Sequence, residues 1–226
     1  MKISCIIPAY NEGKRIAQVL DVATKHPDFA QVIVVDDGSL DDTASIARAF
    51  PITLISYKKN RGKSYAVQQG LKTAKHNWVC FLDADLQGLT LSDITNLTAP
   101  IKQDRADVSI SLRGNAPWFS HWFGIDYISG ERVYHKKYLP VNALDNKPSF
   151  AIEPILNKNI IDNNLRVAIV RWPGVRSPFK IEKQKSLLGL WSDIKFIYTL
   201  FTTTTIVGPF YQFFKLRSMR IKPLPL

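Results

Sequence analysis

The sequence predicts an α/β fold in which a mostly parallel sheet is flanked by helices and followed by an amphipathic helical tail. Short apolar runs rich in β-branched and aromatic residues alternate with segments of helical periodicity, at the spacing of βαβ units. Three of these runs stop abruptly at polar or acidic residues. Because ligands of open α/β sheets bind at the carboxyl ends of the strands, we expect one functional site at that edge.

The first third of the chain carries the clearest alternation. The apolar runs that predict buried strands are residues 3–8, 32–35 and 79–82, and residues 52–57 predict a further strand. The segments that predict the intervening helices are residues 14–24, 41–50 and 60–75. Ser39 and Asp42, three residues apart, predict a capping box at the start of the second helix.

The following segment continues the pattern less regularly. Thr90 and Asp93 predict the cap of a further helix, in which Pro100 is expected to force a break or a restart. Further elements are expected as strands at residues 107–112 and 165–170 and an amphipathic helix at residues 155–161. The aromatic residues 118–123 form either core or a substrate wall, and we favour core.

The tail differs in composition from the rest of the chain. Residues 187–214 are rich in apolar, aromatic and threonine side chains, long enough to test as a membrane span. The threonines 202–205 and the Gly208-Pro209 pair disfavour a span, and an interfacial helix with aromatic anchors fits better. The basic residues that follow are Lys215, Arg217, Arg220 and Lys222. Packing onto the domain or a homo-oligomer contact is the alternative use of this tail.

The charge of the chain indicates an anionic partner. The formal net charge is +11, and residues 151–226 hold 12 basic residues against 4 acidic ones. A phosphorylated substrate, a membrane surface or nucleic acid would suit this excess, and solubility alone is the alternative. Cys5 and Cys80 fall inside predicted strands, which indicates core packing in a reducing compartment. The first apolar run is too short for a signal peptide, so we expect a cytoplasmic protein.

Two carboxylates one residue apart, Asp83 and Asp85, follow the fourth apolar run. Successive side chains of an extended strand point opposite ways, so the two carboxylates share a side with the small Ala84 between them. Hard oxygen ligands of this kind suit Mg²⁺ or Mn²⁺. An Asp-x-Asp pair can also be a turn or a helix cap. That alternative is disfavoured because polar residues 10–12 and 36–37 end two other strands at the same predicted edge.

Five motifs occur in order between residues 3 and 153. They are Pro8-Ala9-Tyr10-Asn11-Glu12, Val35-Asp36-Asp37-Gly38-Ser39, Asn60-Arg61-Gly62-Lys63, Asp83-Ala84-Asp85-Leu86-Gln87 and Ser129-Gly130-Glu131-Arg132. Together they resemble the family-2 glycosyltransferases, which implies a GT-A, Rossmann-like fold. The Asp-Ala-Asp-Leu-Gln form is most similar to the polyprenyl-phosphate branch of the dolichol-phosphate mannose synthase type. The Ser-Gly-Glu-Arg form is also similar to synthases that glycosylate phosphoglycerate.

The resemblance implies a nucleotide-sugar donor with a uracil or guanine base, and it implies which residues bind it. The predicted donor-binding residues are Pro8, Ala9, Tyr10, Asn11, Glu12, Asp36, Asp37, Lys63, Asp83, Ala84 and Arg113. Asp37 would accept the N–H of the base, and Asp36 would share this role or brace the loop. Lys63 and Arg113 lie where a cation approaches the phosphates, or else are solvated surface charges.

The resemblance also implies a metal cofactor, Mg²⁺ or Mn²⁺, held at the acidic strand end. The predicted ligands are Asp83, Asp85 and Gln87, with Asp83 contacting either the ribose or a metal-bound water. Relatives acting on soluble acceptors often carry a metal-binding histidine in a Gly-Val-x-His setting, where this chain has Gly174-Val175-Arg176-Ser177. Either Gln87 and water complete the metal shell, or metal dependence is weak. Arg176, Lys180 and Lys183 are expected to supply positive charge instead.

The reaction implied by the resemblance is transfer of the sugar with inversion, with Asp85, Glu153 and Arg132 as catalytic residues. A phosphate acceptor needs no deprotonation, and Arg132 would bind it, whereas a hydroxyl acceptor would need Glu153 as a base. We expect a polyprenyl phosphate acceptor, met by a peripheral protein on the cytoplasmic face of the membrane. The expected catalytic domain is residues 1–185, divided into a donor half (1–115) and an acceptor half (116–185), with residues 186–226 as the tail.

Other classes of protein fit the sequence less well. A soluble enzyme acting on a small phosphorylated acceptor is the first alternative. A basic module that binds nucleic acid or anionic lipid without catalysis gains nothing from three acidic loops, which repel phosphate without a metal, so no nucleic-acid partner is expected. A dinucleotide-dependent oxidoreductase is disfavoured because no GxGxxG follows the first strand.

Overall fold

The computed structural model of the chain describes residues 1–126, 128–139, 152–178 and 208–221. Within these residues seven strands form one sheet in the order β3-β2-β1-β4-β6-β5-β7. The strands are β1 (Ile3–Ala9), β2 (Phe29–Asp36), β3 (Thr53–Ser56), β4 (Trp78–Phe81), β5 (Val108–Arg113), β6 (Arg132–His135) and β7 (Val167–Trp172). Only β6 among these strands runs antiparallel to its neighbours, β4 and β5. The predicted α/β fold with a mostly parallel sheet is therefore confirmed.

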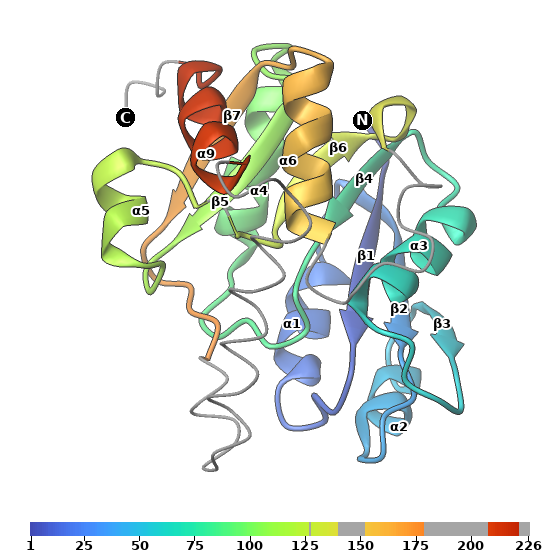
Figure 1. Cartoon of the computed structure of the whole chain (residues 1–226). Coiled ribbons are helices and arrows are strands. Elements are labelled where there is room, and N and C mark those ends of the chain that lie inside the picture. The colour runs from blue at the N-terminus through green and yellow to red at the C-terminus, as the bar shows by residue number, and fades with distance from the viewer. Residues whose placement is uncertain (127, 140–151, 179–207, 222–226) are drawn as a thin grey trace.

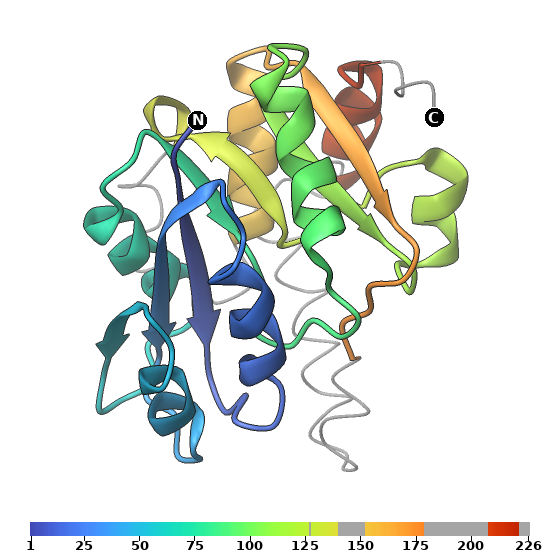
Figure 2. The same ribbon diagram turned by 180° about the vertical axis from the view of Figure 1, so that it is seen from behind.

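Helices cover both faces of the sheet (Figures 1 and 2). One face carries α1 (Ile16–Ala23), α2 (Thr43–Arg48) and α4 (Leu91–Lys102). The other face carries α3 (Lys63–Thr73), α6 (Ile152–Asp162) and α9 (Gly208–Ser218). The short helix α5 (Trp118–Phe123) follows β5, and a 3₁₀ turn (Lys136–Tyr138) follows β6.

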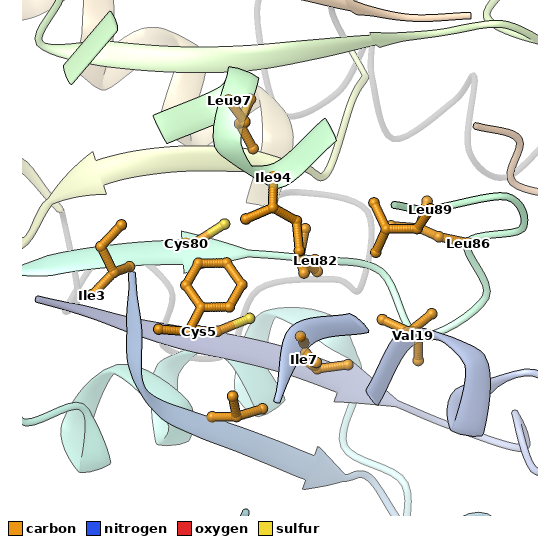
Figure 3. Close-up of a cluster of buried hydrophobic side chains, with 14 of the residues drawn as sticks. Ile3, Cys5, Ile7, Val19, Cys80, Leu82, Leu86, Leu89, Ile94 and Leu97 are labelled. Carbon is orange, nitrogen blue, oxygen red and sulfur yellow. The ribbon is translucent and has the colours of Figure 1, made fainter. Parts of the chain in front are cut away.

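Two hydrophobic cores separate the sheet from these helix layers. Figure 3 shows one of them, which contains Cys5 and Cys80 from adjacent strands together with Val19 of α1 and Ile94 of α4. Both cysteines are free and buried, so their predicted place in the core is confirmed. Burial of this kind stabilises the sheet through apolar area removed from water, about 25 cal/mol per Å².

Three local predictions on helix ends have different outcomes. The capping box of Thr90 and Asp93 is present at the start of α4. The predicted box of Ser39 and Asp42 is wrong, because the Ser39 hydroxyl accepts the Asn11 N–H instead and the cap of α2 makes no side-chain hydrogen bond. The predicted break at Pro100 is also wrong, since α4 continues to Lys102 and Pro100 lies inside its last turn.

The described part of the tail packs on the domain. Helix α9 starts at Gly208, and Pro209 is tolerated because N–H groups of a first turn have no helical partner. Leu216 is buried against the α6 layer, while Tyr211 is 58% exposed and Phe214 56% exposed. Packing onto the domain therefore holds for the face of this helix that carries Leu216, while the face with Tyr211 and Phe214 is exposed. Residues 187–207, Lys222 and the expected domain boundary at residue 185 lie outside the described residues.

Two further observations bear on surfaces. In the described ranges, no helix has both the length and the apolarity that crossing a bilayer requires.

The expectation that residues 118–123 are core is wrong for Trp122, which is 76% exposed. The side chain of Ser120, two residues earlier, is buried, so α5 presents different faces to the domain and to solvent.

Candidate functional site at the carboxyl edge of the sheet

The loops that follow β1 and β2 are joined by hydrogen bonds. The N–H of Asp37 donates to the carbonyl of Ala9 (2.8 Å), and the N–H of Asn11 donates to the Ser39 hydroxyl (2.9 Å). The side-chain oxygen of Asn11 in turn accepts the N–H of Leu40 (2.8 Å). Since β1 lies between β2 and β4, the sheet brings the polar ends of all three strands to one edge, as the sequence predicts.

The remaining residues of the first loop are held differently from one another. The N–H of Glu12 donates to the hydroxyl of Thr43 (2.8 Å), and the Glu12 carboxylate pairs with Arg15 (3.3 Å). Tyr10 is 44% exposed, so its ring is accessible for stacking on a ligand. Ala9 is buried and Pro8 half-buried, which makes these two residues part of the wall of the site rather than its polar groups.

The carboxylates of Asp36 and Asp37 are both buried and both hold loops in place. Asp36 accepts hydrogen bonds from the Ser56 hydroxyl (2.7 Å) and the Ser39 N–H (3.2 Å). Asp37 accepts the backbone N–H groups of Arg61 (2.9 Å) and Gly62 (2.6 Å). Burial raises the pKa of Asp37, and the two N–H donors offset only part of that rise. Asp36 thus braces the loop, one of its two predicted roles, while base recognition by Asp37 stays a prediction.

Lys63 lies between two carboxylates. Its Nζ is 2.8 Å from Oδ1 of Asp83 and 2.9 Å from Oε1 of Glu153. Although burial favours the neutral amine, these two carboxylates hold the pKa of Lys63 well above its ordinary value. Lys63 is therefore a paired ammonium inside the site, and the alternative of a solvated surface charge is wrong. A cavity of about 10 Å³, the size of one water, adjoins the three side chains.

Gly130 sets how closely the next loop approaches Asp83. A Cβ atom at position 130 would lie 2.7 Å from Oδ1 and 2.8 Å from Oδ2 of Asp83. Such separations are shorter than any ordinary contact, so only glycine lets the loop and the carboxylate occupy this arrangement. Close packing against Asp83 therefore explains why the Ser-Gly-Glu-Arg motif has a glycine at its second position.

Arg113 belongs to a buried network beside the site. Its guanidinium is 3.2 Å from Asp126 and 3.6 Å from Glu131. The Glu131 carboxylate also accepts the hydroxyls of Ser111 (2.7 Å) and Ser129 (2.9 Å). Burial raises the pKa of Glu131, and the nearby guanidinium lowers it only in part. The side chain of Arg113 is 11% exposed, so it is not a solvated surface charge. Its role in donor binding stays a prediction.

Arg132 is buried at the wall of the site. Its side chain is fully buried, and its guanidinium donates to the carbonyl of Ser129 (2.8 Å) and to Oδ1 of Asn157 (2.6 Å). The reason is topological, because β6 is an interior strand and Arg132 points from it toward α6. Arg132 nevertheless lines the same small cavity as Lys63, Asp83 and Glu153, and its contact with an acceptor phosphate stays a prediction.

Asp85 is 8% exposed and is held by a loop that lies 92 residues later in the chain. The Ser177 hydroxyl donates a hydrogen bond of 3.0 Å to Oδ1 of Asp85. Gln87 is exposed, and its backbone pairs with that of Arg176 in both directions, at 2.8 and 3.0 Å. Ala84 is buried between the two acidic residues, as its small size predicts. Lys180 and Lys183 lie outside the described residues.

Comparison with protein families identifies the chain. The profile of Glycosyl transferase family 2 matches residues 4–152. The chain belongs to glycosyl transferase family 2. The matched segment includes the loops after β1, β2 and β4 and ends just before Glu153, so it contains most of the site described above, while Glu153 and Ser177 lie beyond it.

Individual relatives of this family 2 chain match over shorter segments. An uncharacterized protein of Methanocaldococcus jannaschii is 35% identical over 118 residues, which cover 48% of this chain and 50% of that protein. A dolichyl-phosphate beta-glucosyltransferase of Trichomonas vaginalis is 38% identical over 94 residues, which cover 35% of this chain and 28% of that protein. The aligned segments thus span from about a quarter to half the length of these curated relatives.

A solved structure resembles nearly the whole chain. Glucosyl-3-phosphoglycerate synthase from Mycobacterium tuberculosis, in complex with Mn²⁺, UDP and glucosyl-3-phosphoglycerate, aligns with a TM-score of 0.71. The alignment covers 89% of this chain and 79% of that chain at 21% sequence identity. At that identity the likeness supports the fold of the family 2 chain and leaves its substrates open.

The donor atoms at the end of β4 fit a divalent cation. Mg²⁺ in proteins commonly takes one or two carboxylates and completes its shell with water and substrate phosphate. Asp83 and Asp85 are two carboxylates after β4 of this family 2 chain, and the exposed Gln87 is a further oxygen donor. Within the described ranges no group of three His, Cys, Asp or Glu residues could hold a metal alone. Metal binding by Asp83, Asp85 and Gln87 therefore stays a prediction.

Sequence reasoning missed several residues of the site. Asp126 and Glu131 pair with Arg113, Ser129 donates to Glu131, and Ser177 with Asn115 supports Asp85. The Ser-Gly-Glu-Arg motif contained a signal for Glu131, but its contact with Arg113 depends on the pairing of β5 with β6. Nothing in the spacing of Asn115 and Ser177, 62 residues apart, indicates that they meet.

Proposed function

We propose that the chain transfers a sugar, with inversion, from a UDP- or GDP-sugar to a phosphate-bearing acceptor. The observation that carries the proposal is the meeting of the loops after β1, β2 and β4 at one edge of the sheet, with the paired Lys63 beside the acidic end of β4. Membership of glycosyl transferase family 2 supports it. In this proposal residues 1–115 bind the donor and residues 116–185 bind the acceptor.

The donor is assigned to the exposed side of this edge. Tyr10, Asn11 and Asp37 would contact the base and the ribose, since an aromatic ring stacks on a base and a carboxylate accepts its N–H. Asp83, Asp85 and Gln87 would hold Mg²⁺ or Mn²⁺. When bound, the cation supplies Lewis-acid neutralisation of the charge on the departing nucleoside diphosphate.

The chemistry is one in-line displacement at the anomeric carbon. The acceptor oxygen forms a bond to that carbon, and the bond to the donor phosphate breaks and leaves its electron pair on the nucleoside diphosphate. A phosphate acceptor is already an anionic nucleophile and needs only to be oriented. A hydroxyl acceptor needs a base. Glu153 could act as that base only after its ion pair with Lys63 is broken. The ion pair therefore favours a phosphate acceptor.

Two acceptor classes are supported by different observations. The Trichomonas relative is named a dolichyl-phosphate glucosyltransferase, and the basic tail suits a bilayer surface, so we propose a polyprenyl phosphate met by a peripheral protein on the cytoplasmic face. The Mycobacterium structure, whose chain acts on phosphoglycerate, favours a small phosphorylated acceptor as the alternative.

The first experiment identifies the donor and the acceptor. The purified chain is screened by thermal shift against UDP- and GDP-sugars with Mn²⁺ present. The stabilising donor is then incubated with a polyprenyl phosphate in detergent and, separately, with 3-phosphoglycerate, and the products are analysed by mass spectrometry. We expect a glycosylated polyprenyl phosphate. Product from 3-phosphoglycerate alone would contradict the lipid acceptor, and no product from either would contradict the phosphate-acceptor proposal.

The second experiment tests the acidic site itself. Asp85→Asn removes a charge from the predicted metal site and should lower turnover by roughly 10²- to 10³-fold, since a charge stabilised in the transition state is lost. Asp21→Asn is a matched control, because Asp21 is an exposed carboxylate on α1 paired only on the surface with Lys25. Near-normal turnover of Asp85→Asn would contradict the metal assignment.

A further inference from the structure

Backbone hydrogen bonds hold the loop that carries Ser177 against the loop that carries Asp85. Arg176 and Gln87 exchange backbone hydrogen bonds of 2.8 and 3.0 Å, and the N–H of Gly114 donates to the carbonyl of Val175 (3.0 Å). A Cβ at Gly88 would lie 2.5 Å from the carbonyl oxygen of Gly174. The two loops thus approach more closely than side chains would allow, which limits how far Ser177 can move from Asp85.

Asn115 fixes the main chain of Ser177 from both sides. Its side-chain N–H donates to the Ser177 carbonyl (2.7 Å), and its side-chain oxygen accepts the Ser177 N–H (3.2 Å). With its backbone held, Ser177 has only its side-chain torsions left, and its hydroxyl donates to Oδ1 of Asp85 at 3.0 Å. The hydrogen bond therefore restrains the plane of the Asp85 carboxylate.

We propose that Ser177 is a positioning residue that holds the Asp85 carboxylate ready for a divalent cation bound with a nucleoside diphosphate. The inference rests on the proposed function, because it assumes that Asp85 is a metal ligand. A hydrogen bond to the outer side of a ligating carboxylate fixes its orientation before the metal arrives. In this chain the orienting group is a serine hydroxyl whose backbone is anchored by Asn115.

The test measures metal binding directly. Mn²⁺ is titrated into the full chain with saturating UDP and, separately, GDP, and free Mn²⁺ is followed by its paramagnetic resonance signal. Ser177→Ala should weaken Mn²⁺ binding about tenfold, the usual effect of removing a residue that orients a metal ligand. Ser177→Thr keeps the hydroxyl and should retain wild-type affinity. Ser218→Ala is the matched control, because the Ser218 hydroxyl donates only to its own helix on α9, and it should bind like wild type.

Each contrary outcome has its own meaning. If wild type binds Mn²⁺ and Ser177→Ala binds it equally well, the positioning role is overturned and the proposed function stands. If Ser177→Thr is weakened as much as Ser177→Ala, the hydroxyl is not the cause and the inference is again overturned. If wild type binds no Mn²⁺ with either nucleotide, the metal-dependent function and the inference fail together.

Discussion

At Gly130 the chain has room for a hydrogen atom and for nothing larger. The missing Cβ would lie 2.7 and 2.8 Å from the carboxylate oxygens of Asp83, so Gly130→Ala should displace that carboxylate from Lys63. We expect turnover to fall about 100-fold, because a shift of about 1 Å in a reacting site has that effect. The measurement is the rate of donor consumption in the presence of the identified acceptor.

The control for this prediction is Gly174→Ala. A Cβ at Gly174 would meet nothing within 4 Å, so the same chemical change is made without a clash. Its turnover should match wild type. Equal activity of the two variants would show that the close approach of Gly130 to Asp83 has no bearing on function.

The sequence predicted the acidic residues of the site but not their partners. Asp83 and Asp85 follow an apolar run, and that order along the chain is visible in the letters alone. The neighbours of Arg132 are set by strand pairing, since an interior strand turns Arg132 toward Asn157 on α6. The burial of Arg132 therefore depends on the assembled sheet and not on its neighbours along the chain.

Among the elements, α4 has an N-terminus whose cap can be tested by itself. The Thr90 hydroxyl accepts the N–H of Asp93 (3.2 Å), and the Asp93 carboxylate accepts the N–H of Thr90 (2.9 Å). Thr90→Ala should lower the free energy of unfolding by about 1 kcal/mol, the usual value of an N-cap. Urea unfolding measures the change. Thr90→Ser keeps a hydroxyl at the cap and should therefore retain most of the wild-type stability. A loss equal in both variants would mean that the hydroxyl contributes nothing.

Side-chain hydrogen bonds and an ion pair join Asp28, just before β2, to helix α4. The Asp28 carboxylate accepts from Nζ of Lys102 (2.8 Å) and from the hydroxyl of Thr98 (2.8 Å). Although burial raises the pKa of Asp28, these two donors outweigh it and hold the pKa below its ordinary value. The stabilisation is present above the unfolded pKa of about 3.9 and is lost as pH falls through the lower folded value.

Asp28→Asn should therefore change the pH dependence of stability. At pH 7 we expect it to lower the free energy of unfolding by about 1 kcal/mol. The gap to wild type should narrow as pH falls below about 4 and the wild-type carboxyl is protonated. Urea titrations between pH 7 and pH 2.5 test this, with Asp21→Asn as an exposed control. A gap that stays constant with pH would contradict the ionic origin of the contact.

The strands and helices followed from local pattern, but their arrangement did not. Apolar runs predicted β1, β2 and β4 closely, because a strand buried on both faces is visible as a continuous apolar segment. The insertion of β6 between β4 and β5 depends on pairing between segments about 25 to 55 residues apart, which no periodicity contains. The predicted cap of α2 was wrong for the same reason, because the Ser39 hydroxyl accepts a hydrogen bond from Asn11 on a different loop.

At the scale of the whole molecule, the net charge of +11 and the exposed side of α9 bear on the proposed membrane contact. Helix α9 buries Leu216 against the domain and exposes Tyr211, Phe214 and Lys215. Aromatic and basic side chains together suit the interface of an anionic bilayer, and each basic residue near the surface is worth about 1 kcal/mol. The full chain should therefore bind vesicles that contain phosphatidylglycerol more tightly than neutral ones.

Charge reversal on α9 makes this prediction specific to one surface. Lys215→Glu with Arg217→Glu should weaken co-sedimentation with anionic vesicles by at least tenfold, because two attractive charges become repulsive. The matched control, Lys72→Glu with Lys75→Glu, changes the net charge equally on an exposed part of the chain around the end of α3. High salt should weaken wild-type binding by screening it. If both double variants lose binding equally, net charge rather than the α9 surface accounts for the attraction. That result would contradict the assignment of α9 as the membrane-binding surface.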